Sequence, residues 1–489
     1  MGQLYQKACA ALLATALCIS MGACTSGSPS SSTTDPSGSG TSSETAPSSG
    51  DVTAFKSKYA DRNDIDLGGR TITIANQKWW KASGSNLFMD RIAENIDYFE
   101  NLWNFKLEYV YPAGAHDEYH QKLSTSVLSG EPVADIAWVD STYLFPGFMA
   151  SGVIQNVSDL DVFDFSEKKW DRGMMESLSS YKGKIYGLYS YGFDASGYYT
   201  DIGWGVFFNK DYFEDNSLPE LYQLVRDGEW TWDKMIEVAK QATITSGGVK
   251  TYGLTIFQDA LPFINSGSTR LVTDNKDGTY TFNGMNENII RAMEYYFANA
   301  ATTLPVGTEL YPWIHPHTGQ WDFPMAAFKA QEAAMCVAPW TTLDWYFGSL
   351  PFEWGWVPFP KEKQGDKYAG FTTGSNLWCV LANIENPQDV AMVFDAITDV
   401  EYTDKDYEYF FENQANDDET VEMVGLLLNQ GNIYYDVAWS FPSFVNAFWG
   451  AFDSVRTGSA TSTSAMQSIQ NAQQSLVNES ASRLAAALG

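Results

Sequence analysis

Short apolar runs alternate with amphipathic stretches near the start of the folded part of this chain. The runs have the length and composition of strands, and the stretches between them carry apolar residues at helical spacing. In chain order the segments are Arg70–Ala75, Leu87–Trp103, Lys106–Val110, Asp117–Ser129 and Ala134–Val139. Strand, helix, strand, helix, strand predicts a parallel sheet with helical crossovers, and therefore an α/β fold.

The stretch Lys184–Asp211 marks a change of domain. It contains two short apolar runs, Ile185–Tyr191 and Trp204–Phe208, separated by the polar loop Phe193–Ile202. Each run is bounded by Gly, Asn or Asp, which predicts a buried strand. Because 489 residues are too many for one hydrophobic core, we expect the chain to leave one α/β domain here and to enter another. A ligand would then lie in the cleft between the two domains.

Local signals place further elements in the second half of the chain. Thr231 is the predicted N-cap of a helix over Trp232–Ala242, and Tyr252–Ile256 is predicted to be a strand. Asp274–Gly278 has the composition of a calcium loop, but its Gly comes fifth rather than sixth. The segment therefore predicts a hairpin turn. Asn386, followed by a proline, predicts the cap of another helix.

The first fifty residues predict export and a tether. Lys7 precedes a twelve-residue apolar run, Ala8–Ile19. This run is shorter than the roughly 20 residues of a bilayer span but suits a signal peptide. Small residues before Cys24 resemble a bacterial lipobox, so residues 1–23 are predicted to be a lipoprotein signal peptide and Cys24 to be acylated. A plain signal peptide is the alternative. Residues 24–50 are predicted to be a flexible tether, because 23 of the 26 residues after Cys24 are Ser, Thr, Gly or Pro.

Acidic residues outnumber basic ones by two to one. The chain has 60 Asp and Glu against 30 Lys and Arg, for a net charge of −30. Such a charge repels phosphate backbones, so no nucleic acid is expected as a partner. Beyond the predicted cleavage site, Cys336 and Cys379 lie in apolar surroundings without metal-binding spacing. We expect buried thiols, with a disulfide as the alternative.

The sequence carries no clear signature of a catalytic or metal centre. His116 and His120 are four apart, but residue 117 is Asp instead of the Glu of a zinc-protease motif, and no third ligand is signalled. Surface positions are expected for these two and for His315 and His317. Nucleophile elbow, phosphate-binding loop and dinucleotide fingerprint are all missing. A glycosidase pair among the 60 carboxylates stays an alternative, but we expect no enzyme, no metal and no cofactor.

The positive signal is aromatic. Phe, Trp and Tyr make up 15 % of the chain, and several follow predicted strands or lie in loops. These are Trp80, Tyr143, Tyr191, Phe193, Trp340 and Trp345. Sugar rings present apolar C–H faces and a belt of hydroxyls, so their receptors combine stacked aromatics with polar groups. Core packing is the alternative for each residue, but the set favours a carbohydrate ligand.

Six segments follow one another in an order that is typical of a known family. They are ADIAWVDSTYLFPGFMASGVIQNVSDL (134–160), KIYGLYSYG (184–192), WGVFFNKDYFEDNSL (204–218), EWTWDKMIEVAKQAT (229–243), FKAQEAAMCVAPW (328–340) and WVPFPKEKQGDKYAGFTTGSN (356–376). In this order they resemble the family 1 extracellular solute-binding proteins of bacterial ABC importers, the group that contains maltose-binding protein. The resemblance runs from about Arg70 to Thr398.

The resemblance implies a type II periplasmic-binding-protein fold. In this fold two α/β lobes, joined by a multi-strand hinge, close on a ligand in the cleft between them. Gly187–Phe193 would be the first hinge crossing and Tyr368–Thr372 the return crossing. The implied boundaries are 51–190 plus 372–415 for the N-terminal lobe, and 191–371 plus 416–489 for the C-terminal lobe.

The resemblance also implies ligand contacts at strand ends and hinge crossings. The predicted ligand-binding residues are Trp79, Trp80, Asp140, Tyr143, Tyr191, Phe193, Trp340, Gly374, Ser375 and Asn376. Trp340 is the predicted stacking platform, because a Trp beyond Pro339 is poorly explained as strand interior. Tyr191 and Phe193 are expected to line the floor of the cleft.

Together these features predict a monomeric lipoprotein on the outer face of a bacterial cell membrane. It would capture a carbohydrate, expected to be an oligosaccharide, by closure of two lobes and deliver it to an ABC transporter permease. The alternatives are a secreted carbohydrate-active enzyme and a ligand-sensing lipoprotein that partners a membrane receptor.

Overall fold

The computed structural model describes most of the chain beyond its first 56 residues. The described residues are 57–489 without 79, 83–86, 196–198, 259, 268, 301–321, 373, 404, 431–432 and 442. The predicted signal peptide, Cys24, the tether, Trp79, His315 and His317 lie outside them. Within the described ranges, no helix has both the length and the apolar character that a membrane crossing requires.

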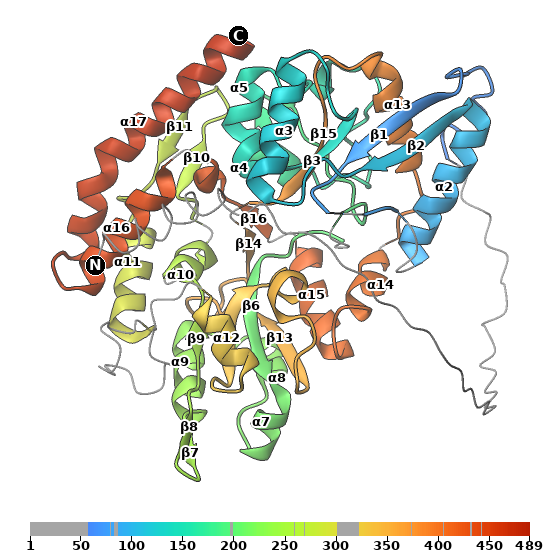
Figure 1. Ribbon diagram of the computed structural model, residues 1–489. Coiled ribbons are helices and arrows are strands. Elements are labelled where there is room, and N and C mark those ends of the chain that lie inside the picture. Colours follow the sequence, from blue (N-terminus) through green and yellow to red (C-terminus); the bar gives the residue numbers. More distant parts are fainter. Residues whose placement is uncertain are drawn as a thin grey trace, which may run out of the picture. The chain divides into compact units, whose positions relative to one another are not determined.

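The first sheet has four strands in the order β15-β3-β1-β2 (Figure 1). β1 pairs in parallel with both β2 and β3, and β15 joins β3 in the antiparallel direction. The strands are β1 (Arg70–Ala75), β2 (Phe105–Val110), β3 (Ile136–Asp140) and β15 (Asn376–Val380). This confirms the predicted parallel sheet, and we call the sheet and its helices the first lobe.

Helices connect and flank the strands of the first lobe. α2 and α3 are the crossovers between the parallel strands, and α13 packs against both α2 and β15. The helices are α2 (Leu87–Trp103), α3 (His116–Leu128), α4 (Ser141–Tyr143), η1 (Leu144–Phe148), α5 (Met149–Ser151), η2 (Val157–Asp159), α6 (Arg172–Leu178) and α13 (Pro387–Ile397). A small hairpin, β4 (Ser180–Tyr181) with β5 (Lys184–Ile185), follows α6.

The second sheet also has four strands, in the order β13-β6-β12-β9. β6 is antiparallel to both neighbours, whereas β9 runs parallel to β12. The strands are β6 (Trp204–Asn209), β9 (Thr255–Ile256), β12 (Met335–Pro339) and β13 (Trp354–Pro358). Every residue of β6 and β13 is buried, which explains why their sequences are continuously apolar instead of alternating. We call this sheet and its helices the second lobe.

The second lobe has short helices on and between its strands. They are α7 (Lys210–Asp215), α8 (Leu221–Arg226), α9 (Trp232–Gln241), α10 (Leu261–Ser266), α11 (Glu287–Tyr295), η3 (Tyr296–Ala300), α12 (Phe323–Lys329) and η4 (Leu343–Phe347). Two hairpins complete this part of the chain: β7 (Ile244–Ser246) with β8 (Val249–Thr251), and β10 (Val272–Asp274) with β11 (Tyr280–Phe282).

The C-terminal ninety residues are mainly helical and contact both lobes. α15 packs on β13, whereas α17 packs on α5 and on the β10–β11 hairpin. The elements are α14 (Asp406–Glu412), α15 (Asp418–Gln430), β16 (Ile433–Tyr435), η5 (Val437–Ser440), α16 (Phe444–Arg456) and α17 (Ser462–Leu488). The lobe boundaries given above therefore stay a prediction, since α17 has partners on both sides.

Two segments that connect the lobes, one with Asp201 and one with β14, are hydrogen-bonded to one another. β14 (Gly370–Thr372) pairs in parallel with β16, and Phe371 stacks on Trp204 with ring centroids 5.8 Å apart. The Thr372 hydroxyl donates a hydrogen bond of 2.9 Å to the buried Asp201 carboxylate, which lies on the other segment. These bonds fix the two segments side by side.

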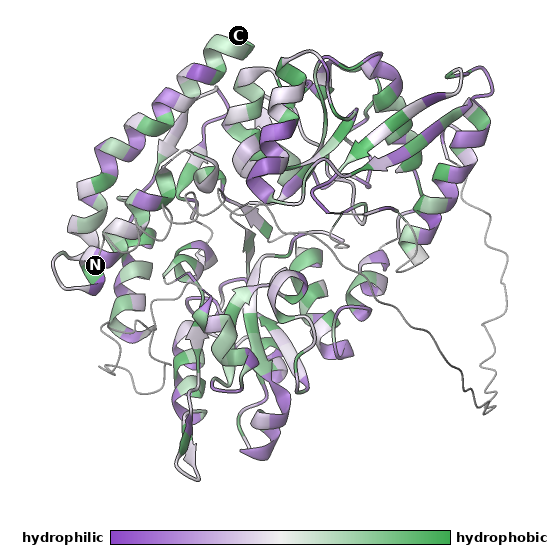
Figure 2. Ribbon diagram, in the orientation of Figure 1, coloured by the Kyte–Doolittle hydropathy of each residue, from purple (hydrophilic) through white to green (hydrophobic). Residues whose placement is uncertain are grey.

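Hydropathy follows this division into sheets and covering helices. In Figure 2 the region around β6 and β13 is mainly green and white, whereas α3 and α7 show much of the purple. The buried apolar side chains form one contiguous cluster. Both cysteines of the described chain are free and buried within it, as predicted.

Most local predictions hold, with three differences. The Thr231 hydroxyl caps α9, and Asp274–Gly278 connects β10 to β11. Asn386 precedes α13 but makes no capping bond, because its backbone is left-handed with φ of 45°. The two differences in strand length arise because the backbone pairs only in part: Ile185–Tyr191 is a strand only at Ile185, and Tyr252–Ile256 only at its last two residues.

Candidate functional site

The first lobe gathers several of the predicted ligand contacts at one edge of its sheet. Parallel strands β1 and β3 end at this edge, and the antiparallel β15 begins there, so that Asn376 pairs with Asp140. The Ser141 N–H donates to the Ser375 carbonyl at 2.8 Å, and the Ser375 N–H donates to the Ser141 hydroxyl at 3.2 Å. The structure thus brings Asp140 and the segment 374–376 together as neighbours.

Asp140 is held by hydrogen bonds on both carboxylate oxygens. Oδ1 accepts from the Thr142 backbone N–H and hydroxyl, each at 2.7 Å, and Oδ2 lies 3.3 Å from His116 Nε2. Burial raises the pKa of Asp140, but the bonds from His116 and Thr142 outweigh it, so the pKa lies below its ordinary value. The side chain is 26 % exposed, so the carboxylate is fixed, ionised and still accessible.

His120 is buried, which corrects the prediction of a surface position. Only 2 % of it is exposed, because its ring is stacked on Tyr143 with centroids 4.1 Å apart. Nε2 accepts from the Asp140 backbone N–H at 3.1 Å, so Nδ1, 2.8 Å from the His116 carbonyl, carries the proton. The ring is therefore neutral, and burial lowers its pKa. The Tyr143 hydroxyl donates to Asp117 at 2.6 Å, so this predicted contact is oriented from α3.

Trp80 and Asn76 follow β1 at the same edge. Trp80 is half-buried and packs on Phe193 and Trp378, with ring centroids 5.3 and 5.4 Å away. Asn76 is 4 % exposed, and its Nδ2 has no partner among the described residues. A buried amide without a partner is unusual. Asn76 is therefore a candidate ligand contact that sequence reasoning missed, although its place directly after a strand was a usable signal.

Trp340 does not form an open platform. It is fully buried and packs against Trp356 and Phe411 with ring centroids 5.4 and 5.3 Å away. Its indole N–H donates to Gln414 at 3.0 Å, and its backbone N–H donates to the Gly203 carbonyl at 2.8 Å. Pairing with the β6 side thus continues past Pro339, so Trp340 behaves as strand interior. The predicted stacking role is not supported by this geometry.

Aromatic rings do lie at the corresponding edge of the second lobe. Trp204 is sandwiched between Phe371 and Phe257, whose ring is stacked at 5.6 Å. Phe257 in turn contacts Trp345, with centroids 6.4 Å apart. Trp345 is 45 % exposed, the feature that Trp340 was expected to have. We call Trp204, Phe257, Trp345 and Phe371 the aromatic row.

Gln258 adds a polar group beside the aromatic row. It follows β9, which runs parallel to β12, so both strands end at the same edge. Its φ of 61° is left-handed, which is uncommon outside Gly and Asn and often marks a functional site. Its buried Oε1 finds no partner in the described part of the chain. This residue, too, was missed from sequence.

One ion pair joins the two edges. Lys78, just beyond β1, lies with its Nζ 3.2 Å from Asp344 of η4, and the two side chains are 50 % and 42 % exposed. This pair connects the segment after β1 to the start of η4.

Phe193 and Tyr191 lie in the predicted first hinge crossing, Gly187–Phe193. Phe193 is fully buried, and its carbonyl accepts from the Trp378 indole N–H at 2.6 Å. Tyr191 is half-buried and stacked on Tyr199 at 4.9 Å, and burial raises its pKa. The expectation that Phe193 lines the cleft floor is corrected, because no face of its ring is open. For Tyr191 a ligand contact stays a prediction.

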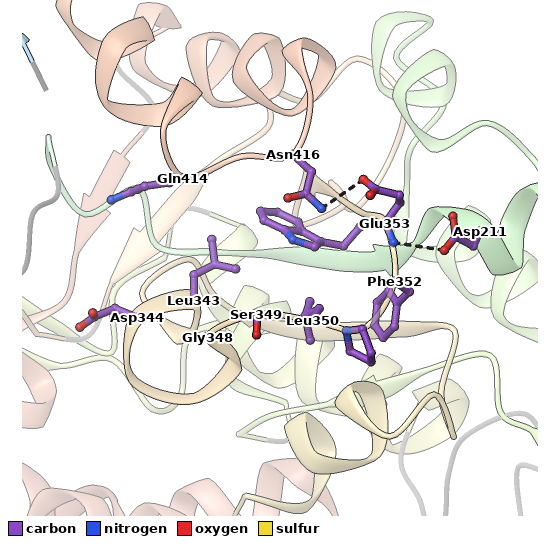
Figure 3. Close-up of a pocket in the computed structure, with 12 residues that line it drawn as sticks. Asp211, Leu343, Asp344, Gly348, Ser349, Leu350, Phe352, Glu353, Gln414 and Asn416 are labelled. Atoms are coloured by element: carbon purple, nitrogen blue, oxygen red, sulfur yellow. Dashed lines mark hydrogen bonds between the residues drawn. The ribbon is translucent and has the colours of Figure 1, made fainter. Parts of the chain in front are cut away.

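A cavity of about 760 Å³ lies on the second lobe and extends from β13 to Asp344, the partner of Lys78. Its walls come from Leu343, Asp344, residues 348–354, Gln414 and Asn416, with Asp211 at one end (Figure 3). The Asn416 amide donates to Glu353, whose own N–H donates to Asp211. Most of the cavity lies beside β13, the outer strand on the side of the sheet away from β9, and no predicted ligand-binding residue lines it. We therefore place the candidate site at the two joined edges instead.

The described residues contain no group of three or more His, Cys, Asp or Glu side chains that could hold a metal ion. His116 and His120 do lie together, with ring centroids 4.6 Å apart. Their nitrogens are engaged by Asp117, Asp140 and backbone groups instead. The cluster is thus a hydrogen-bonded support for Asp140 and Tyr143.

Comparison with solved structures shows the same fold in several binding proteins. UgpB from Mycobacterium tuberculosis, solved in complex with glycerophosphocholine, is 15% identical with a TM-score of 0.56, over 84% of this chain and 98% of that one. The GacH receptor of Streptomyces glaucescens, solved unliganded and with acarbose, is 15% identical with a TM-score of 0.54, over 84% and 98%. The maltose/maltodextrin-binding domain MalE from Bdellovibrio bacteriovorus, bound to maltotriose, is 15% identical with a TM-score of 0.52, over 83% and 100%.

No curated protein sequence matches this chain. A family model does match, however: bacterial extracellular solute-binding protein, over residues 91–403, which is more than half of the chain. The match begins after β1 and overlaps most of the range of the predicted resemblance, and it includes β3 and β15 of the first lobe and all four strands of the second sheet. The chain belongs to the bacterial extracellular solute-binding proteins and has their two-lobe, type II periplasmic-binding-protein fold.

Proposed function

We propose that this protein is the carbohydrate-binding component of a bacterial ABC importer and performs no chemistry on its ligand. A neutral oligosaccharide would bind between the two joined edges, with hydroxyls on the first lobe and an apolar ring face on the aromatic row. Closure of the lobes would present it to a membrane permease. The family membership and the ligands named for GacH and MalE support this proposal.

The proposal depends on the different chemistry of the two strand edges: the first-lobe edge is polar, and the second-lobe edge is mainly aromatic. The first-lobe edge offers Asp140, the segment 374–376 and the Asn76 amide nitrogen, which has no partner among the described residues. The second-lobe edge offers the half-exposed Trp345 and the unpartnered Gln258 oxygen. A sugar needs both kinds of surface, because its hydroxyls and its C–H faces point in different directions. Trp79 and Trp80 are proposed as further contacts beyond β1.

A thermal-shift screen with neutral mono- and oligosaccharides tests the proposal. A ligand at 100 times its Kd should add about 2.7 kcal/mol to the free energy of unfolding. Chromatography of each hit after incubation checks for released products. Stabilisation with the sugar recovered intact is expected. Catalytic turnover would favour the enzyme, and the absence of any stabilising carbohydrate would contradict the proposed ligand class.

The anchor is a separate part of the proposal. Acylation of Cys24 would hold the monomeric body outside the cell membrane on the Ser/Thr/Gly/Pro-rich tether. Expression with a labelled fatty acid should mark the wild-type protein and leave Cys24→Ser unlabelled. Equal labelling of both would contradict acylation at this position.

A further inference from the structure

Two proposed ligand contacts of the first lobe are supported from one place, the start of α3. Asp140 faces His116, and the Tyr143 hydroxyl donates to Asp117, the next residue of the helix. One turn further on, His120 stacks on Tyr143 and accepts from the Asp140 backbone. The position of both contacts therefore depends on side chains that are not themselves predicted contacts.

His116 lies between two carboxylates. Its Nε2 is 3.3 Å from Asp140 Oδ2, and its Nδ1 is 3.4 Å from Asp117 Oδ1. Ionised carboxylates only accept hydrogen bonds, and a neutral imidazole has a single N–H. Both contacts can therefore be hydrogen bonds only when both ring nitrogens carry protons. The geometry around His116 is that of an imidazolium.

His120, four residues later, is the opposite case. One of its nitrogens accepts a backbone N–H, so this ring keeps its place only in the neutral form. Burial of the ring also disfavours its charged form. The structure thus assigns different protonation states to two histidines of one helix face, and only His116 is half-exposed and set to titrate.

We propose that His116 is a positioning residue whose protonation holds Asp140 and Asp117 in place, so that carbohydrate capture is stronger when His116 is charged. The proposal rests on the proposed function, because it takes Asp140 and Tyr143 to be ligand contacts. It adds a pH dependence to that function and names the side chain responsible.

The groups that face His116 fix the direction of this dependence. They are Asp117 on its own helix, Asp140 at the end of β3, the neutral ring of His120 and the edge of Tyr143. The hydrogen bond to Asp140 raises the pKa of His116; burial opposes this, and Asp117 reinforces it. As the pH rises through that pKa, the neutral ring can donate to only one carboxylate, so either Asp140 Oδ2 or Asp117 Oδ1 loses its hydrogen bond from His116.

Side-chain NMR of the four histidines in the full extracytoplasmic chain tests directly whether His116 is protonated where it contacts Asp140 and Asp117. We expect His116 to titrate above the ordinary value of 6.5, with both nitrogens protonated below its midpoint, and His120 to stay neutral with the proton on Nδ1. Asp140→Asn should move the His116 midpoint to lower pH. A His116 midpoint at or below 6.5 that is insensitive to Asp140→Asn would overturn the inference.

Binding of maltotriose and acarbose, measured by calorimetry across pH, tests the consequence. The affinity of the wild type should fall about three- to tenfold from about pH 5.5 to about pH 8.5. His116→Gln should give the weaker affinity at every pH, whereas His116→Arg, which keeps two charged donors, should stay strong and lose the pH dependence. His315→Gln with His317→Gln is the matched control and should titrate like the wild type.

These measurements distinguish an error in the proposed carbohydrate ligand from an error in the proposed role of His116. If neither sugar binds while His116 titrates as expected, the choice of carbohydrate is wrong and the protonated state of His116 between the two carboxylates is confirmed. If either sugar binds with an affinity that is flat across pH in the wild type, or changes with pH equally in His116→Gln, the inference is wrong and the proposed function stands. A maltotriose-saturated protein should also show a higher His116 midpoint, because coupling between proton and sugar is reciprocal.

Discussion

The two strand edges that meet at the Lys78–Asp344 pair are built in different ways. On the first lobe, polar side chains are fixed by other polar groups, as Asp140 is by His116 and Thr142. On the second lobe, rings are fixed by other rings, as Phe257 is by Trp204 and Trp345. The positions of hydrogen-bonded polar side chains depend on protonation and geometry, whereas those of stacked rings depend on the apolar area that they bury. We therefore expect the edges to respond differently to pH and to mutation.

The largest effect is expected from a buried charge that supports the first lobe. Lys169 is 3 % exposed and lies 2.7 Å from Asp395, which is fully buried in α13. Lys169→Met leaves Asp395 with Lys58 and Tyr59 as partners. It should still cost about 3 kcal/mol in the free energy of unfolding, because it removes the buried member of a buried ion pair. Denaturant unfolding measures this. Lys184→Met, whose exposed pair with Asp159 is also 2.7 Å long, is the control and should cost less than about 1 kcal/mol.

Two tryptophans five residues apart test the second lobe. Trp340→Ala should lower the free energy of unfolding by about 3–5 kcal/mol, because the ring is fully buried. Trp345→Ala should cost far less stability but weaken sugar binding by about 1–3 kcal/mol, because its exposed face is the proposed platform. Denaturation and calorimetry on both variants provide the four numbers. The reverse assignment, with Trp340→Ala folded normally and defective in binding, would restore Trp340 as the platform.

The segment with Asp201, which connects the lobes, should have a pH response of its own. Burial raises the pKa of Asp201 to about 6, although the Gly203 N–H and the Thr372 hydroxyl donate to it. The folded state therefore holds this proton more tightly than the unfolded state. The contribution of Asp201 to the free energy of unfolding should be greatest below about pH 4, fall by about 2 kcal/mol as the pH rises to about 6 and level off above that.

Asp201→Asn removes this titration and isolates its contribution. The variant should be more stable than the wild type above about pH 7 and similar to it near about pH 4, because an amide carries no charge to desolvate. Denaturant unfolding at both values checks the sign. A variant that is destabilised equally at both would show that Asp201 acts only through its hydrogen bonds.

The smallest effect is expected at the pair that joins the edges. Lys78 and Asp344 are both about half-exposed, so Lys78→Ala should change the free energy of unfolding by less than about 1 kcal/mol. Loss of the pair should nevertheless favour separation of the edges. Scattering from the sugar-free variant should show an equal or larger radius of gyration than the wild type, and a smaller one would contradict the role of the pair.

Much of the fold could be predicted from sequence, because periodicity reports burial directly. The alternation from Arg70 to Val139 and the continuous apolar run of β6 are local patterns, and both correspond to observed elements. Family resemblance supplied the two-lobe arrangement, which no local pattern contains. Asp140 and the segment 374–376, both predicted ligand contacts, are neighbours in the structure, because Asn376 begins β15 opposite Asp140 at the end of β3.

The direction of individual side chains could not be predicted in the same way. Trp340 follows a proline, which argued against a place in the strand interior, but a backbone hydrogen bond to Gly203 continues the pairing with the β6 side. His120 looked like a surface residue until the stack on Tyr143 was visible. Asn76 and Gln258 carry no motif at all, and only their unpartnered amide atoms in the described structure single them out. These are properties of tertiary contacts rather than of sequence spacing.

Amide hydrogen exchange with and without saturating oligosaccharide tests most directly whether a sugar binds between the two edges. Slower exchange is expected at both edges together, around residues 140–143 and 374–376 on the first lobe and around residues 256–258 and 343–346 on the second. Residues 348–353, which line the part of the cavity beside β13, should be unchanged. Protection at one edge alone, or protection centred on residues 348–353, would contradict capture between the two edges.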